Sequence, residues 1–292
     1  MHKFKCSLCE NDKQKIVYDS GRFKVVRCLS CGLGLLLPQP SEKSLDNFYS
    51  RDYFKKDSDS FGYKNYIQMN RSLNNEAERK ISFIKKFSKQ SSTLLDVGAG
   101  LGNFAVSASY NGFKVKILDR SKWAVGYVRK NFNIEGYVST LYESTLPEAK
   151  FDIVTAWDVI EHLTNPLLGF KTLNMFLKRS GFLFLTTPNI DSIDSKILGK
   201  RWYGFKKIPE HVVYFSPSTI RLFAKRTGFE VLEIKNWGFV RNWQFMADKL
   251  KIYNARLGGL FEKQLKFIGI QNKDVYFPFI DMMVVLKNRL NK

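Results

Sequence analysis

The chain has 292 residues, of which 44% are hydrophobic and 15% aromatic, and its 47 Lys and Arg against 27 Asp and Glu give a net charge of +20. This length predicts one main domain with an appendage. No apolar run reaches the ~18 residues of a spanning helix, and the charged start MHKFKC is unlike a signal peptide. We expect a cytoplasmic protein whose basic surface either binds nucleic acid, anionic lipid or phosphorylated substrates, or is simply solvated.

All four cysteines lie in the first 31 residues, as the pairs Cys6/Cys9 and Cys28/Cys31. This C-x2-C spacing predicts a structural Zn²⁺ site, because two thiolates of one turn can reach the same ion and four complete a tetrahedral shell. Two disulfides or four free thiols are the alternatives, and disulfides are disfavoured without a secretory signal. Between the pairs, the apolar runs around Ser20-Gly21 predict a hairpin.

Residues 32–40, GLGLLLPQP, end in prolines that break regular structure. Residues 41–54 predict a short helix and an aromatic loop. Together with the cysteine pairs, the string CGLGLLLPQPSEKSLDNFYSRDYF resembles the leader of a group of bacterial methyltransferases often tied to cell-surface polysaccharide synthesis. We therefore expect a zinc knuckle over 1–40, a linker over 41–71 and a methyltransferase domain over 72–292.

Residues 94–102 read LLDVGAGLG: an apolar run, Asp96, three alternate glycines, and then a helical pattern. A strand, a glycine turn and a helix form a nucleotide site, since glycines let the backbone approach the ligand and the helix start offers N–H groups. A dinucleotide fingerprint would need glycine at Asn103. The pattern resembles motif I of class I S-adenosylmethionine-dependent methyltransferases. That resemblance implies that cofactor contacts come from Asp96, Gly98, Gly100 and Gly102.

From residue 72 to 238 short apolar runs alternate with helical patterns. This predicts an α/β, Rossmann-like fold with a doubly wound, mostly parallel seven-stranded sheet. The expected strands are 93–97, 113–118, 136–139, 151–156, 181–186, 229–234 and 275–286. Asn165-Pro166 and Ser216-Pro217 each predict a helix start, with a capping side chain before proline at the first helical position.

Asp119 ends the second expected strand, about 20 residues beyond the glycines. A carboxylate there can accept both ribose hydroxyls of the cofactor, although it could instead cap the next helix. The resembling family often has an acid near the adenine after the third strand. Here Ser139 or Thr140 takes that place.

The fourth expected strand and its turn read FDIVTAWDVIEHL, with Asp158 at the carboxyl end where α/β sheets bind ligands. The run resembles the corresponding motif of ubiquinone-type O-methyltransferases, which implies a cofactor contact by Asp158. It lacks the Asn/Asp-Pro-Pro-Tyr loop of enzymes that methylate nucleic-acid amino groups. Glu161 and His162 follow, as catalytic candidates or as residues that brace the turn.

Residues 209–231, PEHVVYFSPSTIRLFAKRTGFEV, resemble the stretch before and through the last helix of the same family. We expect His211 on a loop facing the substrate, where it could take a proton from a hydroxyl. It is preferred to His162 as the base, and a purely structural histidine is the alternative.

Residues 236–274 mix aromatic and basic side chains and predict a helical insertion or lid, or else packing into the core. As a lid, this segment would dock on a lipid-linked or phosphorylated acceptor. Contact with a membrane surface is a further alternative.

Together these features predict O-methylation of a sugar, a sugar nucleotide or a lipid-linked glycan. The alternatives are an RNA methyltransferase that uses the knuckle and the basic surface to bind its substrate, and a non-catalytic protein that binds S-adenosylmethionine.

Overall fold

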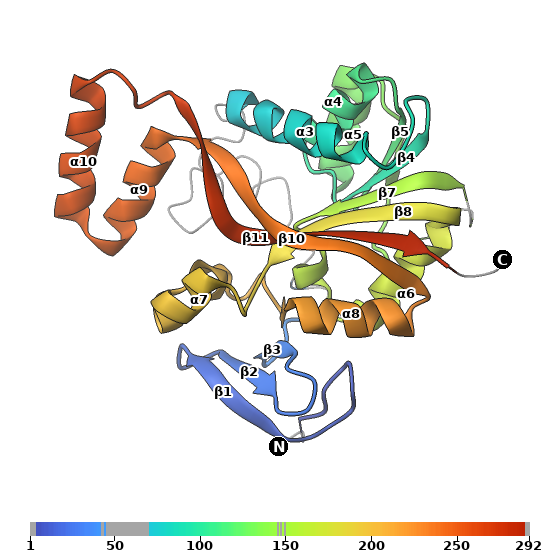
Figure 1. Ribbon diagram of the computed structural model, residues 1–292, viewed down its shortest axis with the longest axis horizontal. Coiled ribbons are helices and arrows are strands. Elements are labelled where there is room, and N and C mark those ends of the chain that lie inside the picture. The colour runs from blue at the N-terminus through green and yellow to red at the C-terminus, as the bar shows by residue number, and fades with distance from the viewer. Residues whose placement is uncertain are drawn as a thin grey trace.

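We describe a computed structural model of the chain, which covers residues 4–41, 44, 70–144, 146, 148 and 150–289 (Figure 1). The helix and aromatic loop expected over 41–54, and most of the expected linker, lie outside the described residues.

The centre of the molecule is a seven-stranded sheet in the order β10-β11-β8-β7-β4-β5-β6. Its strands are β4 (Thr93–Val97), β5 (Lys114–Asp119), β6 (Gly136–Val138), β7 (Phe151–Trp157), β8 (Leu177–Pro188), β10 (Phe229–Asn242) and β11 (Asp274–Asn288). The five strands from β4 to β8 run parallel, and β11 lies antiparallel between β8 and β10. The prediction of a doubly wound, mostly parallel seven-stranded sheet is confirmed.

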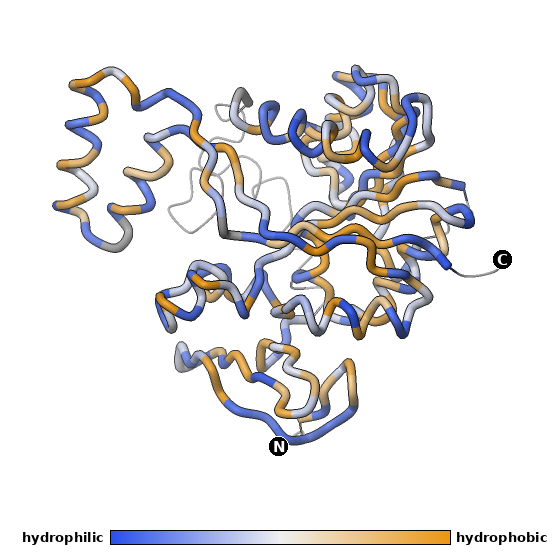
Figure 2. The backbone as a smooth tube through the Cα atoms, viewed as in Figure 1, coloured by the Kyte–Doolittle hydropathy of each residue, from blue (hydrophilic) through white to orange (hydrophobic). Residues whose placement is uncertain are grey.

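Helices cover both faces of this sheet (Figure 1). They are α3 (Asn70–Ile84), α4 (Asn103–Tyr110) and α5 (Lys122–Phe132) on one face, and α6 (Pro166–Phe176) and α8 (Pro217–Arg226) on the other. Neighbouring residues of β4 belong to opposite faces: Leu94 packs in the cluster of α3 and α4, and Leu95 in the cluster of α6 and α8. Since helices cover both faces, the central parallel strands each bury consecutive apolar residues, at positions 94–95 of β4, 153–154 of β7 and 183–185 of β8. Figure 2 shows the corresponding hydrophobic stretches in the sheet.

The two predicted helix starts are confirmed by their caps. The Asn165 side chain accepts a hydrogen bond from the Leu168 N–H at 3.2 Å. Ser216 and Thr219 form a reciprocal capping box at the start of α8. Each cap satisfies backbone N–H groups that the first turn of a helix leaves without a partner.

The N-terminal strands β1 (Gln14–Asp19), β2 (Lys24–Cys28) and β3 (Gly34–Leu37) form a second sheet, completed by β9 (Val213–Tyr214) of the main domain. The predicted hairpin is β1–β2. The following segment is a strand that ends before its prolines, which the sequence analysis did not anticipate. Because β3 pairs with β9 and its leucines join the core of α6 and α8, the N-terminal sheet is continuous with the main domain.

Strands β10 and β11 run past the sheet as a two-stranded extension that carries α9 (Trp243–Tyr253) and α10 (Ala255–Phe267) at its end (Figure 1). The helical part of the expected insertion therefore begins at Trp243, since residues 236–242 continue β10 and pair with β11. Among the described helices, none combines the length and apolar character needed to cross a membrane.

The junction of the two sheets gives a stability prediction. A Cβ on Gly34 would lie 2.7 Å from the Tyr214 Cβ and 3.2 Å from the Ile190 Cδ1. We expect Gly34→Ala to lower the free energy of unfolding in urea by about 1–3 kcal/mol through overpacking. Gly126→Ala, in the interior of α5 with nothing within 4 Å of its added Cβ, is the control and should not destabilise. Equal stability of the Gly34 variant and the wild type would contradict this packing.

Candidate functional site

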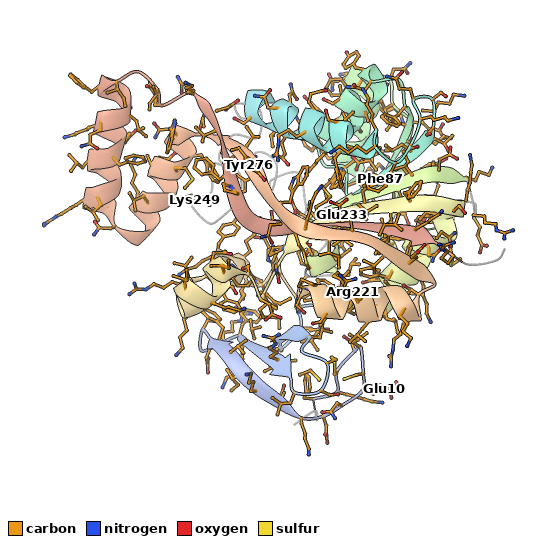
Figure 3. The ribbon with its side chains drawn as sticks, viewed as in Figure 1. Glu10, Phe87, Arg221, Glu233, Lys249 and Tyr276 are labelled. Carbon is orange, nitrogen blue, oxygen red and sulfur yellow. The ribbon has the colours of Figure 1, made fainter. Side chains whose placement is uncertain are left out.

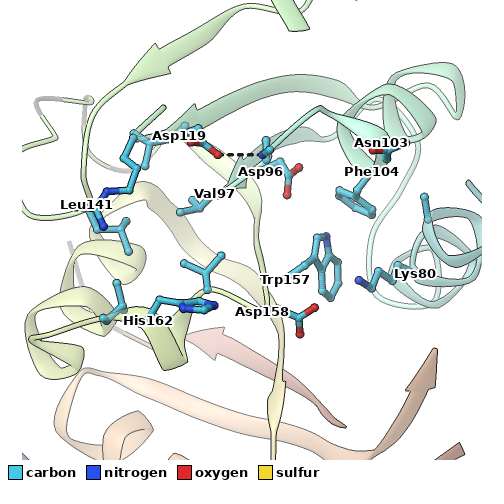
Figure 4. Close-up of a pocket in the computed structure, with 18 of the residues that line it drawn as sticks. Lys80, Asp96, Val97, Asn103, Phe104, Asp119, Leu141, Trp157, Asp158 and His162 are labelled. Atoms are coloured by element: carbon cyan, nitrogen blue, oxygen red, sulfur yellow. Dashed lines mark hydrogen bonds between the residues drawn. The ribbon is translucent and has the colours of Figure 1, made fainter. Parts of the chain in front are cut away.

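A cavity of about 280 Å³ lies at the carboxyl ends of β4, β5 and β7 (Figure 4). Its walls come from the loops after these strands and after β6, from α3, from Lys207 and from Arg241 of the β10 extension. In open α/β sheets this edge is where ligands bind.

The glycine loop after β4 forms one wall of the cavity. Its backbone has positive φ at Gly98 (69°), Gly100 (54°) and Gly102 (81°). Residues with a side chain rarely adopt such φ values, because their Cβ would clash with the backbone. A Cβ on Gly98 would lie 2.6 Å from the Val159 Cγ2. Gly98 and Gly100 line the cavity, whereas Gly102 starts α4 and packs against Val128 of α5.

Asp119 lies at the end of β5 and lines the cavity. Its Oδ2 accepts a hydrogen bond from the Gly100 N–H at 2.9 Å, and its Oδ1 accepts one from the Ser121 N–H at 2.8 Å. The cap of α5 is Ser121, whose hydroxyl accepts from the Ala124 N–H. Asp119 is thus placed where a bound ribose could be held. Ser139 and Thr140 line the neighbouring wall.

Asp96 is almost fully buried beside this wall, at 1% exposure, and accepts a hydrogen bond from the Thr155 hydroxyl at 2.7 Å. Burial raises the pKa of Asp96 to about 7, while the Thr155 hydrogen bond and the charge of Lys80 act in the opposite direction. A ligand cation beside this carboxyl would stabilise its charged form.

Lys80 and Trp157 complete this end of the cavity, and sequence reasoning missed both. The Lys80 Nζ lies 4.6 Å from the centre of the Trp157 ring, and Phe104 meets the same ring edge-on. Within the described residues the buried Trp157 Nε1 has no hydrogen-bond partner. A cation and an N–H donor at one place suit a carboxylate. No motif marks them, because Lys80 belongs to an ordinary amphipathic helix.

Asp158 follows β7 with a φ of +55°, which is unusual for a residue other than glycine. Thr186 on β8 holds it: the hydroxyl donates to the Asp158 Oδ1 at 2.8 Å, and the carbonyl accepts from the Asp158 N–H at 3.1 Å. Such backbone strain gathers at functional sites. The Asp158 side chain lies in the cavity wall (Figure 4).

His162 also lines the cavity, whereas His211 lies behind it at 2% exposure, with ring centres 5.0 Å apart. The His162 Nδ1 is 2.9 Å from the Glu210 carbonyl oxygen. Since a carbonyl can only accept, Nδ1 carries the proton and the lone pair is on Nε2. Burial lowers the pKa of His162 to about 4 and also lowers that of His211, so both rings are neutral at pH 7. The geometry favours His162, against the expected preference for His211 on a substrate-facing loop.

The Glu161 side chain lies close to both histidines. Its carboxyl oxygen lies 4.0 Å from the His211 Nε2 in a fully buried setting. Burial, reinforced by the charge of Asp158, raises the pKa of Glu161. The ligand atoms of Glu161, His162 and His211 lie within 4.8 Å of one another, so this group could hold a divalent cation as well as a proton.

The four cysteines form a separate cluster in the N-terminal sheet, away from the cavity. The Cys6 and Cys31 sulfurs are 3.5 Å apart, as are those of Cys9 and Cys28, and all four lie within 4.8 Å of one another. Four thiolates about 2.3 Å from one Zn²⁺ would be about 3.8 Å apart. These residues therefore fit a tetrahedral metal site.

Residues 69–234 match the sequence model of a family described as "Methyltransferase domain". This match spans more than half of the chain. The chain belongs to that family, and it is a class I S-adenosylmethionine-dependent methyltransferase.

Ubiquinone biosynthesis O-methyltransferases are similar to this methyltransferase. That of Paraburkholderia xenovorans is 28% identical over 162 residues, which cover 51% of this chain and 68% of the relative. That of Paraburkholderia phytofirmans is 27% identical over 163 residues, with the same coverage. These alignments take in about half of the present chain.

Solved structures support the fold. The YcgJ protein of Bacillus subtilis superposes with a TM-score of 0.53 at 18% identity, covering 76% of this chain and 99% of its own. A methyltransferase from Methanosarcina mazei gives 0.51 at 12% identity, covering 72% and 98%. The [4+2]-cyclase SpnF also gives 0.51, at 15% identity, covering 80% and 86%. Because the same fold supports a cyclase, the reaction has to be argued from the site.

The burial of Asp96 predicts how cofactor binding depends on pH. Its pKa is about 7, and a cationic ammonium group binds the carboxylate but not the carboxylic acid. Protonation therefore competes with the ligand, and we expect the Kd for S-adenosylmethionine to rise by up to about tenfold per pH unit as the pH falls below 7. Calorimetry between pH 5.5 and 8 measures this. Asp96→Asn should bind weakly at every pH, without that slope, and an unchanged Kd down to pH 5.5 in the wild type would refute the assignment.

Proposed function

We propose that this methyltransferase methylates a hydroxyl group of a sugar, a sugar nucleotide or a lipid-linked glycan, with His162 as the proton acceptor. The observation that carries the proposal is the position of His162, which lies in the cavity wall with its Nδ1 2.9 Å from the Glu210 carbonyl oxygen, so that the lone pair is on Nε2 (Figure 4). The similarity to O-methyltransferases supports a hydroxyl acceptor.

The residues of the cavity fit S-adenosylmethionine from end to end. Asp96 would bind its ammonium group, and Lys80 with Trp157 its carboxylate. Asp119 would accept the ribose hydroxyls in place of the Gly100 N–H that it now binds. In the cavity wall, Asp158 lies between these residues and His162 (Figure 4). When bound, the cofactor supplies an electrophilic methyl group on a sulfonium.

His162 acts after the oxygen has begun to bond to carbon. A hydroxyl that gains a methyl group becomes a strongly acidic oxonium, so a weak base is enough to take its proton. The His162 Nε2 receives that proton, and the negative charge of Asp158 favours the imidazolium that forms. Orientation of the reacting groups can supply up to ~7–11 kcal/mol, and the positioned base a further ~10²–10⁴-fold.

His211 acts through His162 in this account. Its ring packs edge to face against His162, and the next residue, Val212, donates its N–H to the Glu161 carbonyl at 2.9 Å. The two Glu-His pairs of the chain, at 161–162 and 210–211, are thereby held against each other. His211 is a positioning residue.

Methyl transfer to fractionated cell extract tests the function. With methyl-labelled S-adenosylmethionine, we expect label in the glycan, lipid or nucleotide-sugar fraction. His162→Gln should lower this incorporation by about 10²–10⁴-fold and leave the Kd for the cofactor unchanged, because the substitution removes the base and not the binding site.

Other outcomes would overturn parts of the proposal. Label in RNA would favour the alternative in which the basic chain, with net charge +20, binds nucleic acid. Cofactor binding with label in no fraction would favour a non-catalytic binding protein. Full activity of His162→Gln would exclude His162 as the base. A second metal ion per chain by elemental analysis, beyond the one expected at the four cysteines and lost in His162→Gln, would assign the group of Glu161, His162 and His211 to a metal ion instead.

We also propose that Cys6, Cys9, Cys28 and Cys31 bind one structural Zn²⁺. The spacing of the two pairs and the convergence of their sulfurs support this. Two of the four, Cys6 and Cys28, are buried in the core shared with the main domain, so an ion there would stabilise both sheets.

The zinc proposal predicts the metal content and its effect on stability. We expect one Zn²⁺ per chain by elemental analysis, and less in Cys9→Ser. That variant should also lose at least about 4 °C in Tm, since 1 kcal/mol corresponds to about 2–4 °C for domains somewhat smaller than this chain. Ser30→Ala, exposed in the turn between Cys28 and Cys31, is the control. A metal-free wild type of unchanged stability would contradict the proposal.

A further inference from the structure

Three cations, two of which line the cavity, contact two shared aromatic rings. The Lys207 Nζ lies 5.5 Å and the Lys249 Nζ 5.2 Å from the centre of the Tyr203 ring. The Lys249 Nζ also lies 5.2 Å from the centre of the Phe245 ring, and the Arg241 Cζ lies 5.7 Å from it. The cations come from a short helix before the His211 loop, from α9 and from β10. Figure 3 shows Lys249 on α9, beside the extension that carries Tyr276.

The members of this cation cluster, Lys207, Arg241 and Lys249, lie close enough for the charges of Lys207 and Arg241 to act on Lys249, and Lys207 also interacts with the carboxyl groups of Glu210 and Asp281. Burial, reinforced by the charges of Lys207 and Arg241, lowers the pKa of Lys249 to about 8. Asp248 opposes the shift, but its carboxylate also binds Lys251 at 3.2 Å. Arg241 is itself buried, at 8% exposure. Cations gathered in a partly dehydrated place repel one another, and an anion bound among them would relieve that repulsion.

The cluster lies on the acceptor side of the cavity. Lys207 and Arg241 both line the wall, and the charge of Lys207 contributes to the low pKa of His162. The residues that would hold the cofactor, among them Lys80 and Asp119, come from α3 and from the loops after β4 and β5. An anion on the cluster would therefore be close to the base and outside the cofactor's own contacts.

We infer that the cation cluster binds a phosphate or diphosphate group of the acceptor. This inference rests on the proposed function and names the class of its substrate. The Arg241 guanidinium can bind two phosphate oxygens with its fork, and the two lysines add charge. The faces of Tyr203 and Phe245 contact the lysine and arginine groups and help to hold them in place. A sugar nucleotide and a prenyl-diphosphate-linked sugar both carry such a group.

Titration calorimetry with inorganic pyrophosphate tests the inference on the full chain saturated with S-adenosylhomocysteine. We expect salt-sensitive binding that Lys249→Gln and Arg241→Gln each weaken at least tenfold. Lys251→Gln is the matched control: it is on the same helix, and it pairs with Glu262 at 2.6 Å. Its affinity should stay within twofold of the wild type. The Tm of Lys249→Gln should be equal to that of the wild type or higher, since the substitution removes repulsion.

Two further ligands identify the source of the phosphate. Tighter binding of UDP than of pyrophosphate indicates a sugar nucleotide, and tighter binding of farnesyl diphosphate indicates a lipid carrier. Absence of pyrophosphate binding, equal losses in Lys249→Gln and Lys251→Gln, or displacement of pyrophosphate by S-adenosylhomocysteine would overturn the inference. Because this readout needs no turnover, pyrophosphate binding without methyl transfer would refute the proposed reaction and leave the anion site standing.

Discussion

The close contact between two loops at the carboxyl edge of the sheet organises this molecule. Gly98, after β4, approaches Val159, after β7, so closely that a single Cβ would collide with it. This approach places Asp96 and Asp119 on one side of the cavity and Asp158 with His162 on the other. A cofactor held by the first pair would present its reactive part to the second. Catalysis by alignment depends on this separation.

The two appended parts of the chain are each connected to this cavity. The N-terminal sheet pairs with β9, the strand that directly follows the loop of Glu210 and His211. The extension of β10 and β11 places Arg241 in the cavity wall, and α9 places Lys249 on the same Phe245 ring that Arg241 contacts. The cysteine cluster is therefore connected through β9 to the proposed base, and α9 and α10 are connected to the proposed phosphate site, although all of them lie outside the seven-stranded sheet.

Features encoded by neighbouring residues could be predicted from the sequence. The caps at Asn165 and Ser216 and the positions of strands β4 to β8 along the chain depend on short patterns. Lys80, Lys207 and the strand β3 were missed, because their roles depend on partners far along the chain. The preference for His211 over His162 had the same cause: the buried position of His211 depends on the packing of β9 against β3, which no local pattern records.

The most direct test of this account is a crystal structure with S-adenosylhomocysteine. The account predicts the ribose hydroxyls within hydrogen-bond distance of the Asp119 carboxylate, the amino group at Asp96, and the sulfur on the side of the cavity that His162 lines. A nucleoside bound elsewhere, with Asp119 still bound to the Gly100 N–H, would contradict it. So would a ligand whose sulfur points away from His162.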